Sequence, residues 1–461
     1  MQINAHAQPP SSAKSALDQL DEKYAWHPFS QTVERNVIPP IHVKTGKGSW
    51  LTDEKGNQYL DGNASAWTNV HGHCCKELDE ALQDQVEKIS HSTYLGLANE
   101  PASRLAQKLS ALTGNRLSRT FFTETGACAI EVAIKQSLRY WQLTEQKQRK
   151  ILISMEGAYH GDTFATMSLS DDGPFTAPWR EWALPVCRFK APTHYELDGE
   201  VFYSEQEESL QDLKRILKEH KGTVASLILE PSVQGVAGMA QQPMGFLEKV
   251  SNLCKEEGCH LILDEIFVGF GRLGKVLVGE KNACKADFIC VGKGLSGGYL
   301  PLAACLTSEE TFEAFTGPFS EHKTFYHGHT FTANPLAASV ALASLELLEA
   351  KLNNNALEPH IQWFGECLRN HFFDHPYVSE VRQRGFAACI DLQPSPGEKF
   401  KEPARIGRDL CVIAREKGIL LRPLQNSIPL VPVISMTREE LSMLCTKTRE
   451  SLDLLTQQKY E

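Results

Sequence analysis

Leu261-Ile-Leu-Asp264-Glu265, followed downstream by Val291-Gly-Lys293-Gly294, is the pair of segments that decides the fold. Each segment is an apolar, strand-like run that ends in a charged side chain, Asp264 in the first and Lys293 in the second. Neighbouring strands of a parallel sheet end at the same edge, and α/β proteins place their ligands there. We therefore expect Asp264 and Lys293 to lie close together at one edge of such a sheet.

Similar apolar runs on either side of this pair indicate further strands that are buried on both faces. With the central pair, the expected strands cover 120–123, 151–154, 226–230, 260–264, 288–291 and 303–306. Helical patterns alternate with them. One follows Gly126 and has Ile130, Ala133 and Ile134 on a single face. Alternation of strands and helices predicts an α/β fold with a mainly parallel sheet between helices.

The two ends of the chain have a different pattern. Residues 40–62 are typical of a hairpin, and a long helical stretch at 342–352 is followed by a mixed tail with a final helix from Thr437. We predict a large ligand-binding domain over 76–335. The segments 1–75 and 336–461 would together form a smaller α+β domain.

Composition excludes several classes of protein. The 461 residues carry a net charge of −10 with interspersed signs, which argues against nucleic-acid and anionic-membrane partners. No apolar run approaches the roughly 20 residues that span a bilayer, and residues 1–16 form a polar lead-in rather than a secretory signal. The 13 cysteines include no Cys-x-x-Cys pair, which favours buried thiols in a reducing cytoplasm. We therefore expect a cytoplasmic protein.

No metal site is expected. The stretch His71-Gly-His73-Cys74-Cys75 gathers four possible ligands, but its spacing matches no standard zinc pattern. A nicotinamide cofactor is rejected as well. Gly269-Phe-Gly-Arg-Leu-Gly274 matches the Gly-x-Gly-x-x-Gly pattern, yet it does not open a helix directly, and no suitable acid lies about 20 residues further on.

An acid and a lysine at one sheet edge suit pyridoxal 5′-phosphate (PLP). The lysine amine binds the aldehyde covalently, and the acid keeps the pyridine nitrogen protonated. Gly126 and Ala127 open a helix whose backbone amides and dipole could hold the phosphate, and Tyr159 lies between glycines where its ring could cover a flat cofactor. Taken singly, each feature is also compatible with an ordinary strand end, helix start or turn.

Nearly the whole chain, over residues 24–435, resembles the class III (fold type I) PLP-dependent aminotransferases. The stretches that carry the resemblance are Trp26-His-Pro-Phe-Ser, Leu60-Asp-Gly-Asn-Ala-Ser-Ala-Trp-Thr-Asn-Val-His-Gly-His, Thr125-Gly-Ala, Tyr159-His-Gly-Asp-Thr, Glu230-Pro-Ser-Val-Gln-Gly, Asp264-Glu, Gly-Lys293-Gly, His327-Gly-His-Thr330 and Leu421-Arg422-Pro423. This family implies a mainly parallel seven-stranded sheet. The Trp-His-Pro and Arg-Pro segments resemble the branch that converts 8-amino-7-oxononanoate to 7,8-diaminononanoate in biotin synthesis.

The resemblance also implies roles for cofactor-binding residues. Lys293 would carry the cofactor covalently, Asp264 would pair with the pyridinium nitrogen, and Tyr159 would stack on the ring as part of the catalytic set. Gly126 and Ala127 would bind the phosphate through their backbone.

Further roles concern the substrate and a second subunit. His329 and Thr330 would complete the phosphate site from the other subunit of a homodimer, with Gly328 near the substrate. Arg422 would hold the carboxylate of the oxononanoate, because its planar guanidinium suits that group. We expect the guanidinium to be buried or half-buried, since its neighbours in sequence are apolar. Trp67 would line the channel for the apolar chain.

Three positions depart from better-known members of the family. Phe29, at a substrate-binding position, replaces a common tyrosine, Ala66 stands where a first tryptophan often precedes the second, and His329 replaces a proline. In these changes the chain resembles a branch that uses lysine as amino donor, whereas the usual donor is S-adenosylmethionine. Two other functions stay open. One is an ω-aminotransferase for ornithine, 4-aminobutyrate or a similar amine, and the other is a non-catalytic PLP-fold binding protein.

Overall fold

A computed structural model describes residues 14–36, 38–173, 175–279, 284–398, 400 and 405–460. Most of the polar lead-in expected over 1–16 therefore lies outside the described residues.

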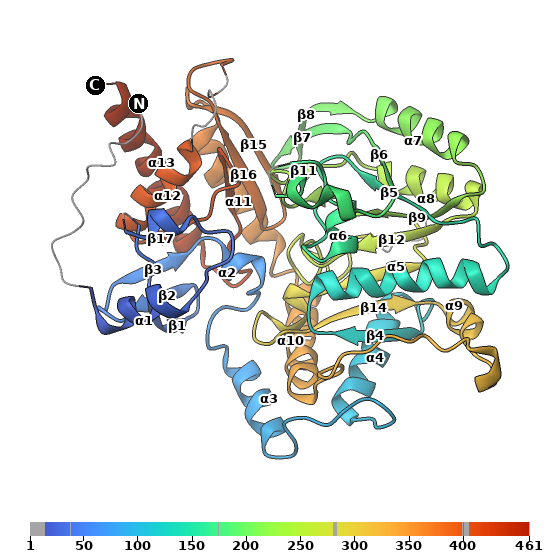
Figure 1. Cartoon of the computed structure of the whole chain (residues 1–461). Coiled ribbons are helices and arrows are strands. Elements are labelled where there is room, and N and C mark those ends of the chain that lie inside the picture. Colours follow the sequence, from blue (N-terminus) through green and yellow to red (C-terminus); the bar gives the residue numbers. More distant parts are fainter. Residues whose placement is uncertain are drawn as a thin grey trace.

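The centre of the molecule is a seven-stranded sheet with the order β4-β14-β13-β12-β9-β5-β6 (Figure 1). Its strands are β4 (Arg119–Thr123), β5 (Ile151–Met155), β6 (Val186–Phe189), β9 (Val224–Leu229), β12 (His260–Asp264), β13 (Phe288–Val291) and β14 (Ala303–Thr307).

Strand direction brings the two charged residues to one edge. Strands β6, β5, β9, β12 and β13 run parallel, and only β14 runs antiparallel to its neighbours β13 and β4. Asp264, at the end of β12, is paired with Cys290 of β13, three residues before Lys293. The α/β fold with a mainly parallel seven-stranded sheet is confirmed. Six of the strands were expected, and the short β6 was not.

Helices cover both faces of this sheet (Figure 1). Side chains of a strand alternate between faces, so Leu261 and Leu263 pack in one core with Val250 of α8, while Ile262 packs in the other with Ile130 of α5. The helices of this part are α3 (Lys76–Val86), α4 (Glu100–Leu112), α5 (Gly126–Leu143), α6 (Phe164–Leu169), α7 (Glu207–Glu219), α8 (Phe246–Glu257), α9 (Glu309–Ala314) and α10 (Pro335–Asn353). Two small hairpins complete it, formed by β7 (Thr193–Leu197) with β8 (Glu200–Glu205), and by β10 (Val233–Gln234) with β11 (Ala240–Gln241).

The two ends of the chain pack beside each other (Figure 1). The expected hairpin is β1 (Val43–Lys47), β2 (Trp50–Asp53) and β3 (Gln58–Asp61), and β3 pairs in parallel with β17 (Ile419–Leu420) from the other end. The C-terminal part adds the sheet β15 (Val378–Arg384), β16 (Ala387–Leu392) and β18 (Ser427–Leu430), with α11 (Glu358–Phe372), α12 (Ile406–Glu416) and α13 (Arg438–Tyr460). Near the N-terminus lie α1 (Ala16–Tyr24) and the short turn α2 (Ala64–Trp67). Domain boundaries at 75 and 335 stay a prediction.

None of the helices in the described ranges combines the length and the apolar character needed to cross a bilayer.

Candidate active site

Lys293 opens a short 3-10 turn, Lys293–Ser296, directly after β13. Its φ of 43° lies in the left-handed region, and its Nζ lies 5.8 Å from the centre of the Trp67 ring and 5.9 Å from that of Phe267. Burial lowers the pKa of the Lys293 amine, while the negative charges of Asp264 and Glu230 act in the opposite direction. A lowered pKa makes more of the amine neutral, which is the nucleophilic form.

Asp264 lies at the same sheet edge and is only 4 % exposed. Its Oδ1 accepts a hydrogen bond from the backbone amide of Ile266 at 3.1 Å, and its Oδ2 lies 2.7 Å from Nδ1 of His160. Nε2 of His160 is buried and has no hydrogen-bond partner among the described residues. His160 thus orients one carboxylate oxygen of Asp264, a contact that the sequence did not predict because 104 positions separate the two residues.

Glu230 is a second acid at this edge, one residue beyond β9, and it is 5 % exposed. Its Oε1 accepts a hydrogen bond from the amide of Gly235 at 3.1 Å, whereas its buried Oε2 has no protein partner in the described part of the chain. Burial, and secondly the charge of Asp264, raise the pKa of Glu230 to about 8. The motif Glu230-Pro-Ser-Val-Gln-Gly did not predict a role for Glu230 itself.

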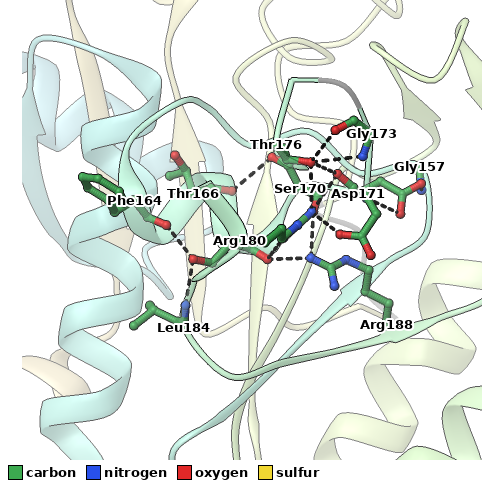
Figure 2. A network of polar contacts seen from close by, with 12 residues as sticks. Gly157, Phe164, Thr166, Ser170, Asp171, Gly173, Thr176, Arg180, Leu184 and Arg188 are labelled. Atoms are coloured by element: carbon green, nitrogen blue, oxygen red, sulfur yellow. Dashed lines mark hydrogen bonds and ion pairs between the residues drawn. The ribbon is translucent and has the colours of Figure 1, made fainter. Parts of the chain in front are cut away.

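A network of polar contacts between side chains and backbone holds Gly157, at the start of the turn that carries Tyr159 and His160, to Asp171 (Figure 2). The Asp171 carboxylate accepts from the amide of Gly157 at 2.9 Å, and the Asp171 amide donates to the carbonyl of Ala158 at 2.8 Å. The guanidinium of Arg180 donates to the carbonyls of Ser170 and Asp171, both at 2.9 Å. The segment around Gly157 and Ala158 is thereby fixed to the segment around Ser170 and Asp171, beside the sheet edge.

Tyr159 is partly buried, and its hydroxyl donates to Asp162 at 2.9 Å. Burial and the negative charge of Asp162 raise the pKa of the Tyr159 phenol, so it stays neutral. A neutral aromatic ring on a fixed turn is suited to packing against a flat ligand.

Gly126 and Ala127 form the start of α5, where the first helical amides have no partner within the helix. The Thr125 side chain accepts a hydrogen bond from the amide of Cys128 at 3.3 Å. The amides of Gly126 and Ala127, which precede it, are the ones left to face a ligand. A Cβ on Gly161 would lie 2.6 Å from the Cβ of Ala127, and one on Gly126 would lie 2.8 Å from Ile266. Close approach of these segments forms a backbone cradle suited to an anion.

Arg422 is exposed, so the expectation that its apolar neighbours in sequence would bury it is wrong. The residue follows the two-residue edge strand β17, and its guanidinium carbon lies 5.9 Å from the centre of the Phe29 ring. In the described part of the chain Arg422 has no ion-pair partner, while its charge acts on the phenol of Tyr159. The Phe29 ring meets Phe175 edge-on at 5.7 Å. Arg422, Phe29 and Tyr159 therefore belong to one surface.

Gly328 and Thr330 are exposed, and two histidines anchor the loop they belong to. His327 contacts Nζ of Lys135 at 2.9 Å, and Nδ1 of His329 lies 2.5 Å from the Glu124 carboxylate. Within one chain this places the loop against the junction of β4 and α5. The structure thus gathers Lys293, Asp264, Tyr159 and Trp67 at one edge but leaves Thr330 facing outward.

The family model for class-III aminotransferases matches residues 31–452. The chain belongs to this family. This aminotransferase is 38% identical over 451 residues to the adenosylmethionine-8-amino-7-oxononanoate aminotransferase of Geobacter sulfurreducens, covering 97% of the chain and 99% of the relative. The crystal structure of the enzyme of that name from Methanocaldococcus jannaschii matches with a TM-score of 0.90 and 37% identity, covering 95% of this chain and 98% of that one.

An ω-transaminase from Pseudomonas jessenii, solved in complex with PMP, matches with a TM-score of 0.85 at 26% identity, over 96% of this chain and 99% of that one. Class III aminotransferases use PLP, and the site fits it. A buried carboxylate, a lysine of lowered pKa and a glycine-lined helix start lie together at one edge. Lys293, Asp264, Tyr159, Gly126 and Ala127 would hold the cofactor, which supplies an aldehyde for amines and a ring that takes up electrons.

Proposed function

We propose that this aminotransferase converts 8-amino-7-oxononanoate to 7,8-diaminononanoate in biotin synthesis. The observation that carries the proposal is the exposed guanidinium of Arg422, which is free of ion pairs in the described residues and lies beside Phe29. A carboxylate at the far end of an apolar chain would bind there, since guanidinium groups pair with carboxylates through two parallel hydrogen bonds. Relatives that carry this substrate in their names match the chain over almost its full length.

Different side chains of the protein would perform different parts of the reaction. With the cofactor bound, Nζ of Lys293 would hold and move the proton at the substrate carbon that bears the nitrogen. Asp264, oriented by His160, would keep the pyridine nitrogen protonated. Trp67 and Phe267, whose ring centres lie 4.7 Å apart, would form an apolar wall next to Lys293.

The amino donor is either S-adenosylmethionine or lysine. Phe29, Ala66 and His329 favour lysine, whereas the names of the relatives favour adenosylmethionine. Incubating the purified holoenzyme with 8-amino-7-oxononanoate and each donor in turn, with product detection by mass spectrometry, tests both points. Diaminononanoate from one donor identifies that donor. If neither donor gives it, while a simple amine such as ornithine or 4-aminobutyrate is turned over, the enzyme is another ω-aminotransferase.

We also propose a cytoplasmic homodimer in which Thr330 completes the partner's phosphate site. The loop around Thr330 is flanked by exposed apolar side chains, namely Leu95 at 72%, Tyr326 at 64% and Phe331 at 57%. Apolar surface of this kind beside a polar loop is typical of subunit contacts. Sedimentation of the holoenzyme at low concentration tests the dimer, and a fully active monomer would contradict it.

A further inference from the structure

The turn Ala64–Trp67 has an unusual handedness. Its four residues have φ values of 42°, 47°, 61° and 69°, all in the left-handed region, and none is glycine. The amides of Trp67 and Thr68 donate to the carbonyls of Asn63 and Ala64 at 2.8 and 3.0 Å, so the segment is one turn of left-handed helix. Side chains with a Cβ disfavour this conformation, and such segments persist only where their surroundings enforce it.

Asp61 enforces the turn. This carboxylate is 2% exposed, and its Oδ2 accepts from both the amide and the hydroxyl of Ser65 at 2.8 Å. The same oxygen lies 3.1 Å from Nε2 of His73, while Oδ1 accepts from the amide of Asn63 at 3.2 Å. Asn63 in turn accepts from the indole Nε1 of Trp67 at 2.8 Å. A single buried acid thus fixes the beginning of the turn and, through Asn63, the Trp67 ring.

The end of the turn is attached to the segment that carries Lys293. The amide of Val70 donates to the carbonyl of Gly297 at 3.3 Å. A Cβ on Gly298 would lie 2.7 Å from the Cα of Asn69, so only glycine permits this approach. Nη2 of the buried Arg272 donates to the carbonyl of Asn69 at 3.2 Å.

This arrangement determines where the Trp67 ring lies. The ring is tilted against Phe267 at 4.7 Å and lies 5.8 Å from Nζ of Lys293. Gly235 leaves room for both rings, since a Cβ there would lie 2.9 Å from Phe267 and 3.2 Å from Trp67. Relaxing four residues to the right-handed region would turn the Trp67 side chain away from this position, because the direction of each Cα–Cβ bond depends on the backbone.

We propose that Asp61 is a positioning residue for substrate selection: it holds the left-handed turn, and with it the Trp67 wall, against the apolar chain of the substrate. The identity of the long substrate rests on the proposed function. The left-handed turn and its contacts with Asp61 do not depend on that function. Asp61 contacts Ser65 and Asn63 directly and reaches Trp67 through Asn63, and none of its hydrogen bonds within the described residues goes to Lys293. Its loss should therefore weaken binding of a long apolar substrate while the chemical step at Lys293 is retained.

The first experiment tests the turn by thermal unfolding of the holoenzyme, a measurement that does not depend on activity. Ala66 is exposed, so Ala66→Gly removes no packing and relieves an unfavourable φ of 61°. We expect it to raise the melting midpoint by about 1–3 °C. The control is Ala350→Gly at an exposed position of the right-handed helix α10, which should lower the midpoint by a similar amount. If Ala66→Gly lowers the midpoint as the control does, residue 66 is not left-handed and the proposal is overturned.

The second experiment compares Asp61→Asn with Asp53→Asn. Asp53 is a matched control because it is also buried and caps a loop, accepting from the amides of Lys55 and Asn57, but it is not part of the Trp67 network. For Asp61→Asn we expect KM for 8-amino-7-oxononanoate to rise about tenfold, with KM for a chain-shortened analogue and kcat within about twofold. Cofactor absorbance per subunit should not change. The control should leave both KM values near those of the wild type.

Equal increases in KM for the long and short substrates, or the same pattern in Asp53→Asn, would overturn the proposal. Should Asp61→Asn not fold, Ser65→Ala removes one hydrogen bond to the carboxylate and should change KM in the same direction by a smaller factor. If the wild type does not act on 8-amino-7-oxononanoate, the proposed function fails by itself. The comparison is then made with the longest apolar substrate that the wild type accepts, and the melting experiment stands as it is.

Discussion

Replacing Glu230 by glutamine should remove a pH dependence of stability. Burial and Asp264 raise the pKa of Glu230 from 4.5 to about 8 in the folded chain. Between these two values the folded protein binds more protons than the unfolded one, so its stability falls as the pH rises through this window. At about 1.4 kcal/mol per pH unit, the upper bound of this loss is about 5 kcal/mol. Glutamine resembles the protonated acid and has no charge to bury.

The assay is urea unfolding of cofactor-free wild type and Glu230→Gln at pH 5.5 and pH 8.5. At the lower pH, about one unit above the pKa of the unfolded chain, the variant should be the more stable by only about 1.4 kcal/mol. At the higher pH the variant should be the more stable by at least about 2 kcal/mol. Glu256→Gln, at an exposed position of α8, controls for loss of a charge alone. If the wild type and Glu230→Gln lose stability equally with rising pH, the raised pKa is refuted.

Three further predictions concern the reaction. Asp264→Asn should retain bound cofactor but lower kcat about a thousandfold, because asparagine cannot stabilise a protonated ring; kcat near that of the wild type would remove Asp264 from the mechanism. Arg422→Ala should raise KM for 8-amino-7-oxononanoate about a hundredfold and change KM for the amino donor little, as initial rates with each substrate varied would reveal. Equal effects on both substrates would argue against a carboxylate contact. Mixing a Lys293→Ala protein with a Thr330→Ala protein should restore activity through hybrid dimers that contain one intact site, and no recovery after subunit exchange would contradict shared sites.

Much of the fold follows from patterns that a sequence displays directly. Continuous apolar runs predicted β12 and β13 with the bounds that the structure has, because these strands are buried on both faces. Strand β6 was missed, since its four residues include Arg188 and three of them are only partly buried. The edge shared by Asp264 and Lys293 was predictable because parallel strands end together.

The contacts between side chains from distant segments were not predictable. His160 reaches Asp264, and His329 reaches Glu124, across separations of 104 and 205 positions that no local pattern records. Exposure of Arg422 depends on the short edge strand before it rather than on its apolar neighbours in sequence. The left-handed turn Ala64–Trp67 lacks the glycines that would normally indicate positive φ.

Mapping of the cofactor's attachment point tests most directly that Lys293 is the centre of this site. The holoenzyme is reduced with borohydride to fix the cofactor and digested, and the peptides are analysed by mass spectrometry. We predict one modified peptide, with the added mass on Lys293, and no modified peptide from Lys293→Ala treated in the same way. Modification of another lysine in the wild type, with Lys293 unmodified, would contradict the assignment of the active site.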